Sequence, residues 1–273
     1  MITIKQKFSE LKKEGKKAFI AYIPFGFPTI KATKDIILTL QKAGVDILEL
    51  GIPFSDPIAD GPVIQEATSI ALARGANTTK LFSFLSDLKK DIKIPIALMT
   101  YYNPVFKFGV EKFFSKMSES GALGILTVDL SIDESKEYVE NARKFGVETI
   151  FFVTPVTSKE RAKAIVGASS GFVYYISVTG ITGTRDISYN SLSKHLRELK
   201  KMTDLPVCVG FGIHSKKQVD EVCKISDGAI VGSAIVKFIK ENYLKQNFLS
   251  RLEKYVKSLK KPETRVQKPD DRK

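Results

Sequence analysis

Short apolar runs alternate with amphipathic stretches along the whole chain. Several of the apolar runs have no polar position on either face, which is typical of strands that are buried on both sides. The stretches between them repeat apolar residues at helical spacing, as where Ile36, Ile37 and Leu40 share one face. Eight strands are predicted, at 18–23, 46–50, 95–100, 123–129, 149–153, 171–177, 206–210 and 228–231.

Helical stretches follow these strands in turn. The predicted helices span 30–43, 62–74, 79–90, 110–119, 133–145, 188–202 and 215–224. Alternating strands and helices imply a parallel sheet. Eight such units in 273 residues predict a single-domain α/β fold, a (β/α)8 TIM barrel, with an open doubly wound sheet as the competing architecture.

The ends of the chain set the expected domain limits. We expect the barrel to occupy residues 1–256, with an N-terminal helix that caps it. Residues 257–273 are rich in lysine, contain Pro262 and Pro269 and have few apolar positions. This composition predicts a disordered basic tail.

The net charge of +13 raises the question of a nucleic-acid or anionic membrane partner. Residues 1–17 carry six lysines and two glutamates, and residues 254–273 carry eight basic and three acidic residues. The two ends therefore hold nine of the 13 surplus charges, and the body of the chain is nearly balanced. We therefore expect no nucleic-acid partner for the body, and nucleic-acid binding through the basic tail is left as an alternative.

The sequence shows neither a signal peptide nor a membrane-spanning segment. The first 17 residues lack the apolar stretch of a signal peptide, and no segment approaches 18 apolar residues. We therefore expect a cytoplasmic protein with no membrane partner.

Two carboxylates mark the end of the second predicted strand and the loop after it. Glu49 ends a strand of Ile and Leu, where desolvation disfavours its charged form and suits it to proton transfer. Asp60 precedes Gly61 and Pro62, at a predicted helix N-terminus that favours an anion. Such a pair can do acid–base chemistry. The alternatives are a structural ion pair, an ordinary helix cap, or a magnesium site that includes Asp56.

Glycine-containing loops follow the last three predicted strands, at 179–184, 210–215 and 231–237. Barrels frequently bind phosphate at the loops after strands seven and eight, and a helix beginning at Ser233 adds a favourable dipole. The alternative is that these glycines only make tight turns. Near the ends of other strands stand Tyr22, Tyr101 and Tyr174, which either belong to the core or hold a flat apolar group.

Five motifs resemble the tryptophan synthase α-subunit family, in consistent order over about residues 3–250. They read LELGIPFSDPIADGPVIQEA (48–67), YYNPVF (101–106), GFVYYISVTGITG (171–183), GFGI (210–213) and DGAIVGSAIVK (227–237). The sequence departs from the family's usual residues at Pro24-Phe25, Leu123 and Ser131. None of these positions is one of the two carboxylates or the phosphate glycines.

The resemblance implies a (β/α)8 barrel that cleaves indole-3-glycerol phosphate to indole and glyceraldehyde 3-phosphate, without metal or organic cofactor. It implies that Glu49 is the general acid–base and that Asp60 accepts the hydrogen bond of the indole N–H. Tyr22, Tyr101 and Tyr174 would line the indole pocket, and Thr182 would belong to a mobile lid. The implied phosphate site comprises Gly183, Gly212, Gly232 and Ser233.

The resemblance also implies a partner. A β subunit would receive the indole and use its own pyridoxal phosphate to join it to serine, in an α2β2 tetramer. Pro53 and Asp56 would face that partner. Two alternatives are left open: another phosphate-binding barrel, such as a sugar-phosphate isomerase or epimerase, and a non-catalytic activator of a β subunit.

Overall fold

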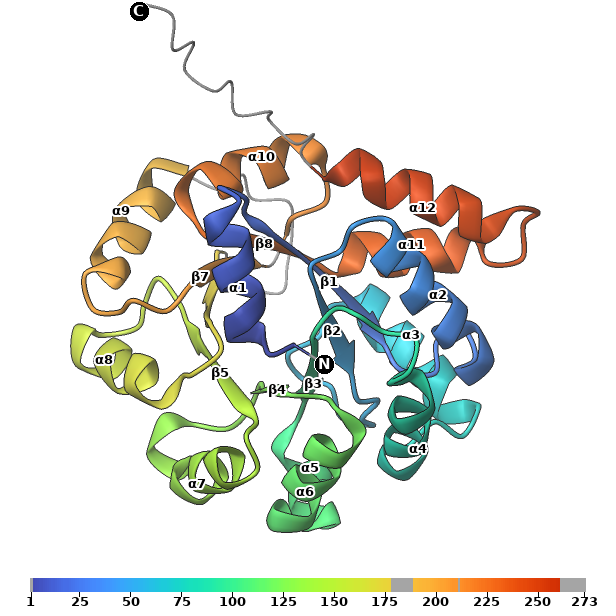
Figure 1. Cartoon of the computed structure of the whole chain (residues 1–273), viewed down its shortest axis with the longest axis horizontal. Helices are drawn as coiled ribbons and strands as arrows, with labels where there is room; N and C mark the ends of the chain where they lie inside the picture. The colour runs from blue at the N-terminus through green and yellow to red at the C-terminus, as the bar shows by residue number, and fades with distance from the viewer. Residues whose placement is uncertain (1, 178–188, 211, 261–273) are drawn as a thin grey trace, which may run out of the picture.

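The computed structural model describes residues 2–177, 189–210 and 212–260. Within them eight parallel strands close into a barrel in chain order, and the last strand pairs with the first. Figure 1 looks into this barrel and shows the helices as a ring around it. The strands are β1 (Ala18–Pro24), β2 (Ile47–Gly51), β3 (Ile96–Thr100), β4 (Gly124–Thr127), β5 (Glu148–Val153), β6 (Val173–Ile176), β7 (Val207–Gly210) and β8 (Gly228–Val231).

All eight predicted strands are present, and the closed sheet excludes the doubly wound alternative. The helices are α1 (Ile4–Lys13), α2 (Ile30–Lys42), α3 (Pro62–Ala73), α4 (Thr78–Leu88), α5 (Tyr102–Phe108), α6 (Val110–Ser120), α7 (Lys136–Lys144), α8 (Lys159–Ala168), α9 (Tyr189–Lys200), α10 (Lys216–Ile225), α11 (Ser233–Asn242) and α12 (Phe248–Leu259), with a 3-10 turn η1 (Ile132–Glu134) before α7.

Local sequence sets the limits of several helices. The side chains of Thr29 and Asn77 accept hydrogen bonds from the amides of Ala32 and Lys80, so that α2 and α4 begin where free N–H groups are satisfied. At the other end, Gly121 follows α6 in the left-handed conformation with φ 85°, which a residue with a Cβ rarely adopts. The chain can therefore turn directly from α6 into β4.

Two apolar layers hold the barrel together. Residues that point inward from the strands, such as Ile20, Ile47 and Ile230, pack inside the barrel. Residues that point outward, such as Leu48 and Leu98, pack against the surrounding helices. Strands with both faces buried have few polar positions, and an ionisable side chain inside them is therefore exceptional.

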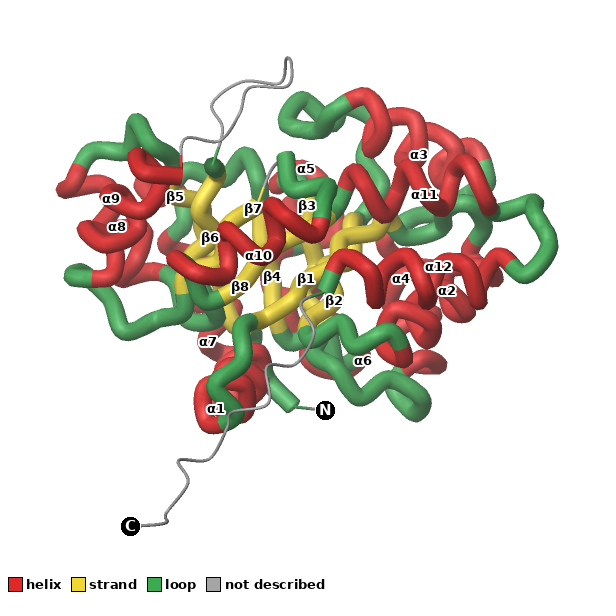
Figure 2. Tube along the Cα trace, turned by 90° about the horizontal axis from the view of Figure 1, so that it is seen from above, coloured by secondary structure: helices red, strands yellow, loops and turns green. Residues whose placement is uncertain are grey.

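Helix α1 closes one end of the barrel, as the sequence predicts. Figure 2 shows it at the lower end of the strands. Its residues Ile4, Phe8 and Leu11 are buried within the inner layer. The carboxylate of Glu148 accepts hydrogen bonds from the amides of Ile4 at 2.7 Å and Lys5 at 3.0 Å, and so caps the helix onto β5.

The C-terminal limit of the folded part lies beyond the predicted residue 256. Helix α12 continues to Leu259, which is buried. Lys260 follows it, with its ammonium group hydrogen-bonded to the carbonyl of Gly44 and 3.4 Å from the carboxylate of Asp46. These contacts attach the end of α12 to the loop before β2. The rest of the predicted tail lies outside the described residues.

Strand β4 is shorter than the sequence predicts and ends at Thr127 rather than at residue 129. The carboxylate of Asp129 accepts a hydrogen bond from the amide of Tyr102 at 2.7 Å, so that Asp129 holds the start of α5 instead of extending the strand. In the described part of the chain, none of the helices combines the length and apolar character needed to cross a bilayer.

Candidate active site

Glu49 points into the barrel at the end of β2 that faces away from α1. Its side chain is 1% exposed, and neither carboxylate oxygen has a hydrogen-bond partner among the described residues. Burial without a compensating partner raises the pKa of Glu49 to about 8. The carboxyl group therefore holds a proton at neutral pH and can release it to a bound molecule.

Asp60 lies in the loop between β2 and α3 and is 7% exposed. Burial raises its pKa to about 6, while a hydrogen bond with Tyr101 opposes that rise. The N-cap of α3 is Gly61, with no side-chain capping bond, so Asp60 does not cap this helix. The sequence predicts that the N-terminus of this helix stabilises the Asp60 carboxylate, but the effect of burial on its pKa is larger. The two carboxyl groups still have different pKa values, and near pH 7 one is protonated and the other ionised.

Tyr101 connects Asp60 to its loop. Its hydroxyl accepts a hydrogen bond from the amide of Ala59 at 3.0 Å and donates one to the Asp60 carboxylate. Its ring packs against Phe54 at a centroid distance of 5.2 Å. Tyr101 stands directly after β3 and therefore fixes the position of Asp60 from a neighbouring strand.

Tyr22 and Tyr174 lie inside the barrel with Glu49. Burial raises the pKa of each phenol, and the negative charge of Glu49 contributes to that rise. Tyr22 is paired with Glu49 in the register of β1 and β2. Tyr174 packs edge-on against Phe152, with centroids 4.9 Å apart. All three predicted tyrosines are thus buried around the two carboxylates.

The predicted phosphate loops lie at the same end of the barrel. Gly232 is the N-cap of α11 and Ser233 is its first residue, exposed to solvent. Gly212 follows β7 with φ 78° and is exposed. A helix N-terminus with free amides beside two glycines is suited to an anion. Thr182 and Gly183 lie outside the described residues.

The two residues predicted to face a partner differ in exposure. Asp56 is exposed in the loop after β2, where its carboxylate accepts a hydrogen bond from Ser55 at 2.5 Å. Pro53 is buried and can influence a partner only through the shape of this loop. Across the described residues no group of three or more His, Cys, Asp or Glu is arranged to hold a metal ion, so Glu49, Asp56 and Asp60 do not form the alternative magnesium site.

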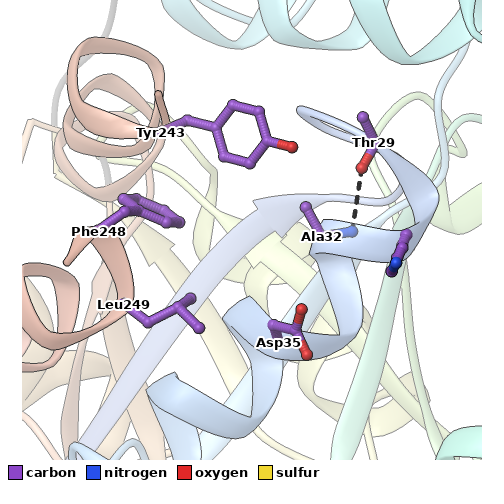
Figure 3. Close-up of a pocket in the computed structure, with 7 residues that line it drawn as sticks. Thr29, Ala32, Asp35, Tyr243, Phe248 and Leu249 are labelled. Atoms are coloured by element: carbon purple, nitrogen blue, oxygen red, sulfur yellow. Dashed lines mark hydrogen bonds between the residues drawn. The ribbon is translucent and has the colours of Figure 1, made fainter. Parts of the chain in front are cut away.

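A hollow of about 330 Å³ lies elsewhere, between the start of α2 and the segment that joins α11 to α12. Figure 3 shows Tyr243, Phe248 and Leu249 on one side of it and Asp35 on the other. None of the predicted catalytic or phosphate-binding residues lines this hollow. It is separate from the candidate active site.

Two glycines at strand ends shape the site. Gly51 is not among the residues that the sequence singles out, and Gly210 is predicted only as part of the loop at 210–215. A Cβ atom on Gly51 would lie 2.4 Å from the hydroxyl of Tyr22, and one on Gly210 would lie 2.1 Å from the hydroxyl of Tyr174. Each glycine thus leaves space for a phenol from a neighbouring strand. The sequence does hold an indication for Gly51: it stands two residues after Glu49, and residues two apart in a strand lie on the same face.

Comparison with known proteins agrees with this geometry. The family model of the tryptophan synthase alpha chain matches residues 8–264. A tryptophan synthase alpha chain of Thermoanaerobacter sp. (strain X514) is 40% identical over 260 residues, which cover 95% of this chain and 99% of the relative. One of Arabidopsis thaliana is also 40% identical, over 95% of this chain and 94% of the relative.

Solved structures give the same result. The tryptophan synthase subunit alpha of Legionella pneumophila str. Paris superposes with a TM-score of 0.87 at 33% identity, covering 95% of this chain and 97% of that one. A chain of tryptophan synthase from M. tuberculosis, in an aminoacrylate-bound form, superposes with a TM-score of 0.84 at 32% identity, over 94% and 97% of the two chains. The chain belongs to the tryptophan synthase alpha chain family.

Proposed function

We propose that this chain cleaves indole-3-glycerol phosphate to indole and glyceraldehyde 3-phosphate by a retro-aldol reaction. The observation that carries the proposal is the pair of buried carboxyl groups, Glu49 and Asp60, at the mouth of the barrel. Their pKa values of about 8 and about 6 leave Glu49 protonated and Asp60 ionised near neutral pH. The lyase activity of the alpha chain needs one proton donor and one anion at the same ring.

The two carboxyl groups then have complementary roles. Protonated Glu49 gives its proton to the ring carbon that carries the glycerol chain, and the indole ring becomes a cation. Ionised Asp60 accepts a hydrogen bond from the ring N–H and stabilises that positive charge. The Glu49 carboxylate next takes the proton of the adjacent chain hydroxyl. The carbon–carbon bond breaks, its electrons return to the ring, and an aldehyde forms while Glu49 is protonated again.

The reaction in this form requires no metal and no organic cofactor, because one carboxyl group supplies and recovers the proton. The phosphate of the substrate would bind at Gly212, Gly232 and the start of α11, together with Gly183. Tyr101 and Tyr174 would hold the indole ring, and Thr182 would belong to the lid. We place the enzyme in the cytoplasm, as its small phosphorylated substrate suggests.

This protonation scheme predicts a bell-shaped dependence of kcat/KM on pH. The rate should rise as Asp60 ionises through about pH 6 and fall as Glu49 loses its proton through about pH 8. Indole release from indole-3-glycerol phosphate, measured from pH 5 to 10, checks both limbs. A rate that keeps rising above pH 8 would show that Glu49 begins the reaction as the carboxylate.

We also propose that a β subunit covers the mouth of the barrel, in an α2β2 assembly, and receives the indole for its own pyridoxal phosphate chemistry. Among the described residues, three large apolar side chains are exposed at this rim. They are Ile58 after β2, Phe106 in α5 and Val156 after β5, with exposures of 74%, 65% and 80%. Asp56 lies beside Ile58. Apolar side chains grouped at one end of a protein favour a protein partner there.

A substitution at Ile58 tests the partner surface. Ile58→Asp should weaken binding of the β subunit at least about tenfold, because it places a charge in an apolar contact. The matched control is Leu244→Asp, which changes a side chain that is 93% exposed between α11 and α12. Binding constants from calorimetric titration with the β subunit compare the two. Equal effects of the two substitutions would place the partner elsewhere.

A further inference from the structure

The phenol of Tyr22 lies along the inner wall of the barrel, between the expected phosphate site and the carboxylates. A Cβ atom on Gly232 would lie 3.3 Å from the Cβ of Tyr22, whereas one on Gly51 would lie 2.4 Å from its hydroxyl. The side chain therefore begins beside the N-cap of α11 and ends beside the last residue of β2. It spans the distance between the two ends of the site.

The hydroxyl of Tyr22 lies on the path from Glu49 to the mouth. Gly51 stands two residues beyond Glu49 on the same face of β2, which places the hydroxyl about 7 Å further along the strand direction. Burial, and after it the charges of Asp60 and Glu49, raise the pKa of this phenol, so both carboxylates lie within electrostatic range of it. Within the described residues no hydrogen bond engages the hydroxyl, although the side chain is only 5% exposed. A bound molecule that covers this hydroxyl without supplying a partner would leave it unsatisfied, which is costly.

The substrate has three parts in a line: a phosphate, a chain with two hydroxyl groups, and the indole ring. If the phosphate binds beside Gly232 and the reacting ring carbon lies at Glu49, the chain between them passes along Tyr22. A phenol ring with a hydroxyl at its far end offers an apolar surface and one hydrogen-bonding group to such a chain.

We propose that the Tyr22 hydroxyl hydrogen-bonds to the hydroxyl-bearing chain of the substrate and so determines specificity for that chain. The proposal rests on the proposed function, and it differs from the indole-pocket role that the family resemblance implies for Tyr22. A site that hydrogen-bonds a substrate hydroxyl discriminates against an analogue that lacks it, because the buried group of the protein then has no partner.

The test distinguishes recognition of the hydroxyl-bearing chain from recognition of the indole ring and the phosphate. Tyr22→Phe removes the hydroxyl and keeps the ring, and should lower kcat/KM for indole-3-glycerol phosphate about five- to tenfold. The probe for the ends is an indole joined to phosphate through an unsubstituted propyl chain. Its dissociation constant, measured by equilibrium dialysis, should be unchanged or lower in Tyr22→Phe, because neither partner then carries a hydroxyl at that point.

Tyr175→Phe is the matched control. The Tyr175 hydroxyl lies outside the barrel, 3.0 Å from Nδ1 of His195, and its removal should leave kcat/KM unchanged. The proposal is overturned if Tyr22→Phe leaves kcat/KM unchanged, or if it weakens the propyl analogue as much as it lowers kcat/KM. If the unmodified protein releases no indole, the proposed function itself fails, which is a different result from either.

Discussion

Glu49→Gln should lower kcat for indole release at least about 100-fold. The amide has the size of the carboxyl group but can neither give nor take the proton that the reaction moves, and general acid–base groups contribute about 100- to 10,000-fold. Both Glu49 oxygens lack partners among the described residues, so the substitution breaks no hydrogen bond there. We therefore expect the loss in the rate rather than in the melting temperature. Initial rates at saturating substrate, with thermal unfolding of the same samples, measure both.

Glu148→Gln is the matched control for that substitution. Glu148 is also a glutamate on a barrel strand, but it is only partly buried, lies at the α1 end and accepts hydrogen bonds from the amides of Ile4 and Lys5. Its neutral amide should weaken the cap of α1 and lower the melting temperature, while the rate per folded molecule stays the same. An undiminished rate in Glu49→Gln would contradict the role of Glu49 in proton transfer.

The barrel itself could be predicted because its determinants are local. Apolar runs such as 206–210 and 228–231 mark strands buried on both faces, and Thr29 and Gly121 mark helix ends. Those signals depend on a few neighbouring residues and on sterics that hold in any protein. The limit of the barrel is expected at residue 256 rather than at Leu259 because Leu259 is a single apolar residue in a lysine-rich stretch, and its burial depends on contacts with distant elements.

The two carboxylates could be predicted for the same reason, but their surroundings could not. An ionisable side chain at the end of an apolar strand stands out in the sequence, as Glu49 does. The hydrogen bond between Tyr101 and Asp60 joins residues 41 positions apart. The placement of Tyr22 between Gly232 and Gly51 brings together β1, β2 and the N-cap of α11, and depends on the register across the closed barrel. Such contacts follow from tertiary packing and leave no periodic signal.

Asp60→Asn should lower kcat/KM about 100- to 1000-fold, the loss typical when one group that stabilises charge in a transition state is removed. The amide can still accept a hydrogen bond from Tyr101 and from an indole N–H, so position and shape are retained. What it lacks is the negative charge opposite the cationic ring. The rise in rate through about pH 6 should disappear with it, since that limb reports the ionisation of Asp60. Indole release as a function of pH measures both effects.

Asp46→Asn is the matched control for this substitution, because Asp46 is equally buried, at 7% exposure, but lies at the opposite end of β2. Its carboxylate accepts a hydrogen bond from the amide of Phe19 at 2.8 Å and lies near the ammonium group of Lys260. The Asp46→Asn variant should therefore be less stable, and the dependence of its rate on pH should be unchanged. If Asp60→Asn retained the limb near pH 6, another group would be responsible for it. Asp60 would then hold the ring by hydrogen bonding alone, and the charge on the indole would have to be stabilised from elsewhere in the mouth of the barrel.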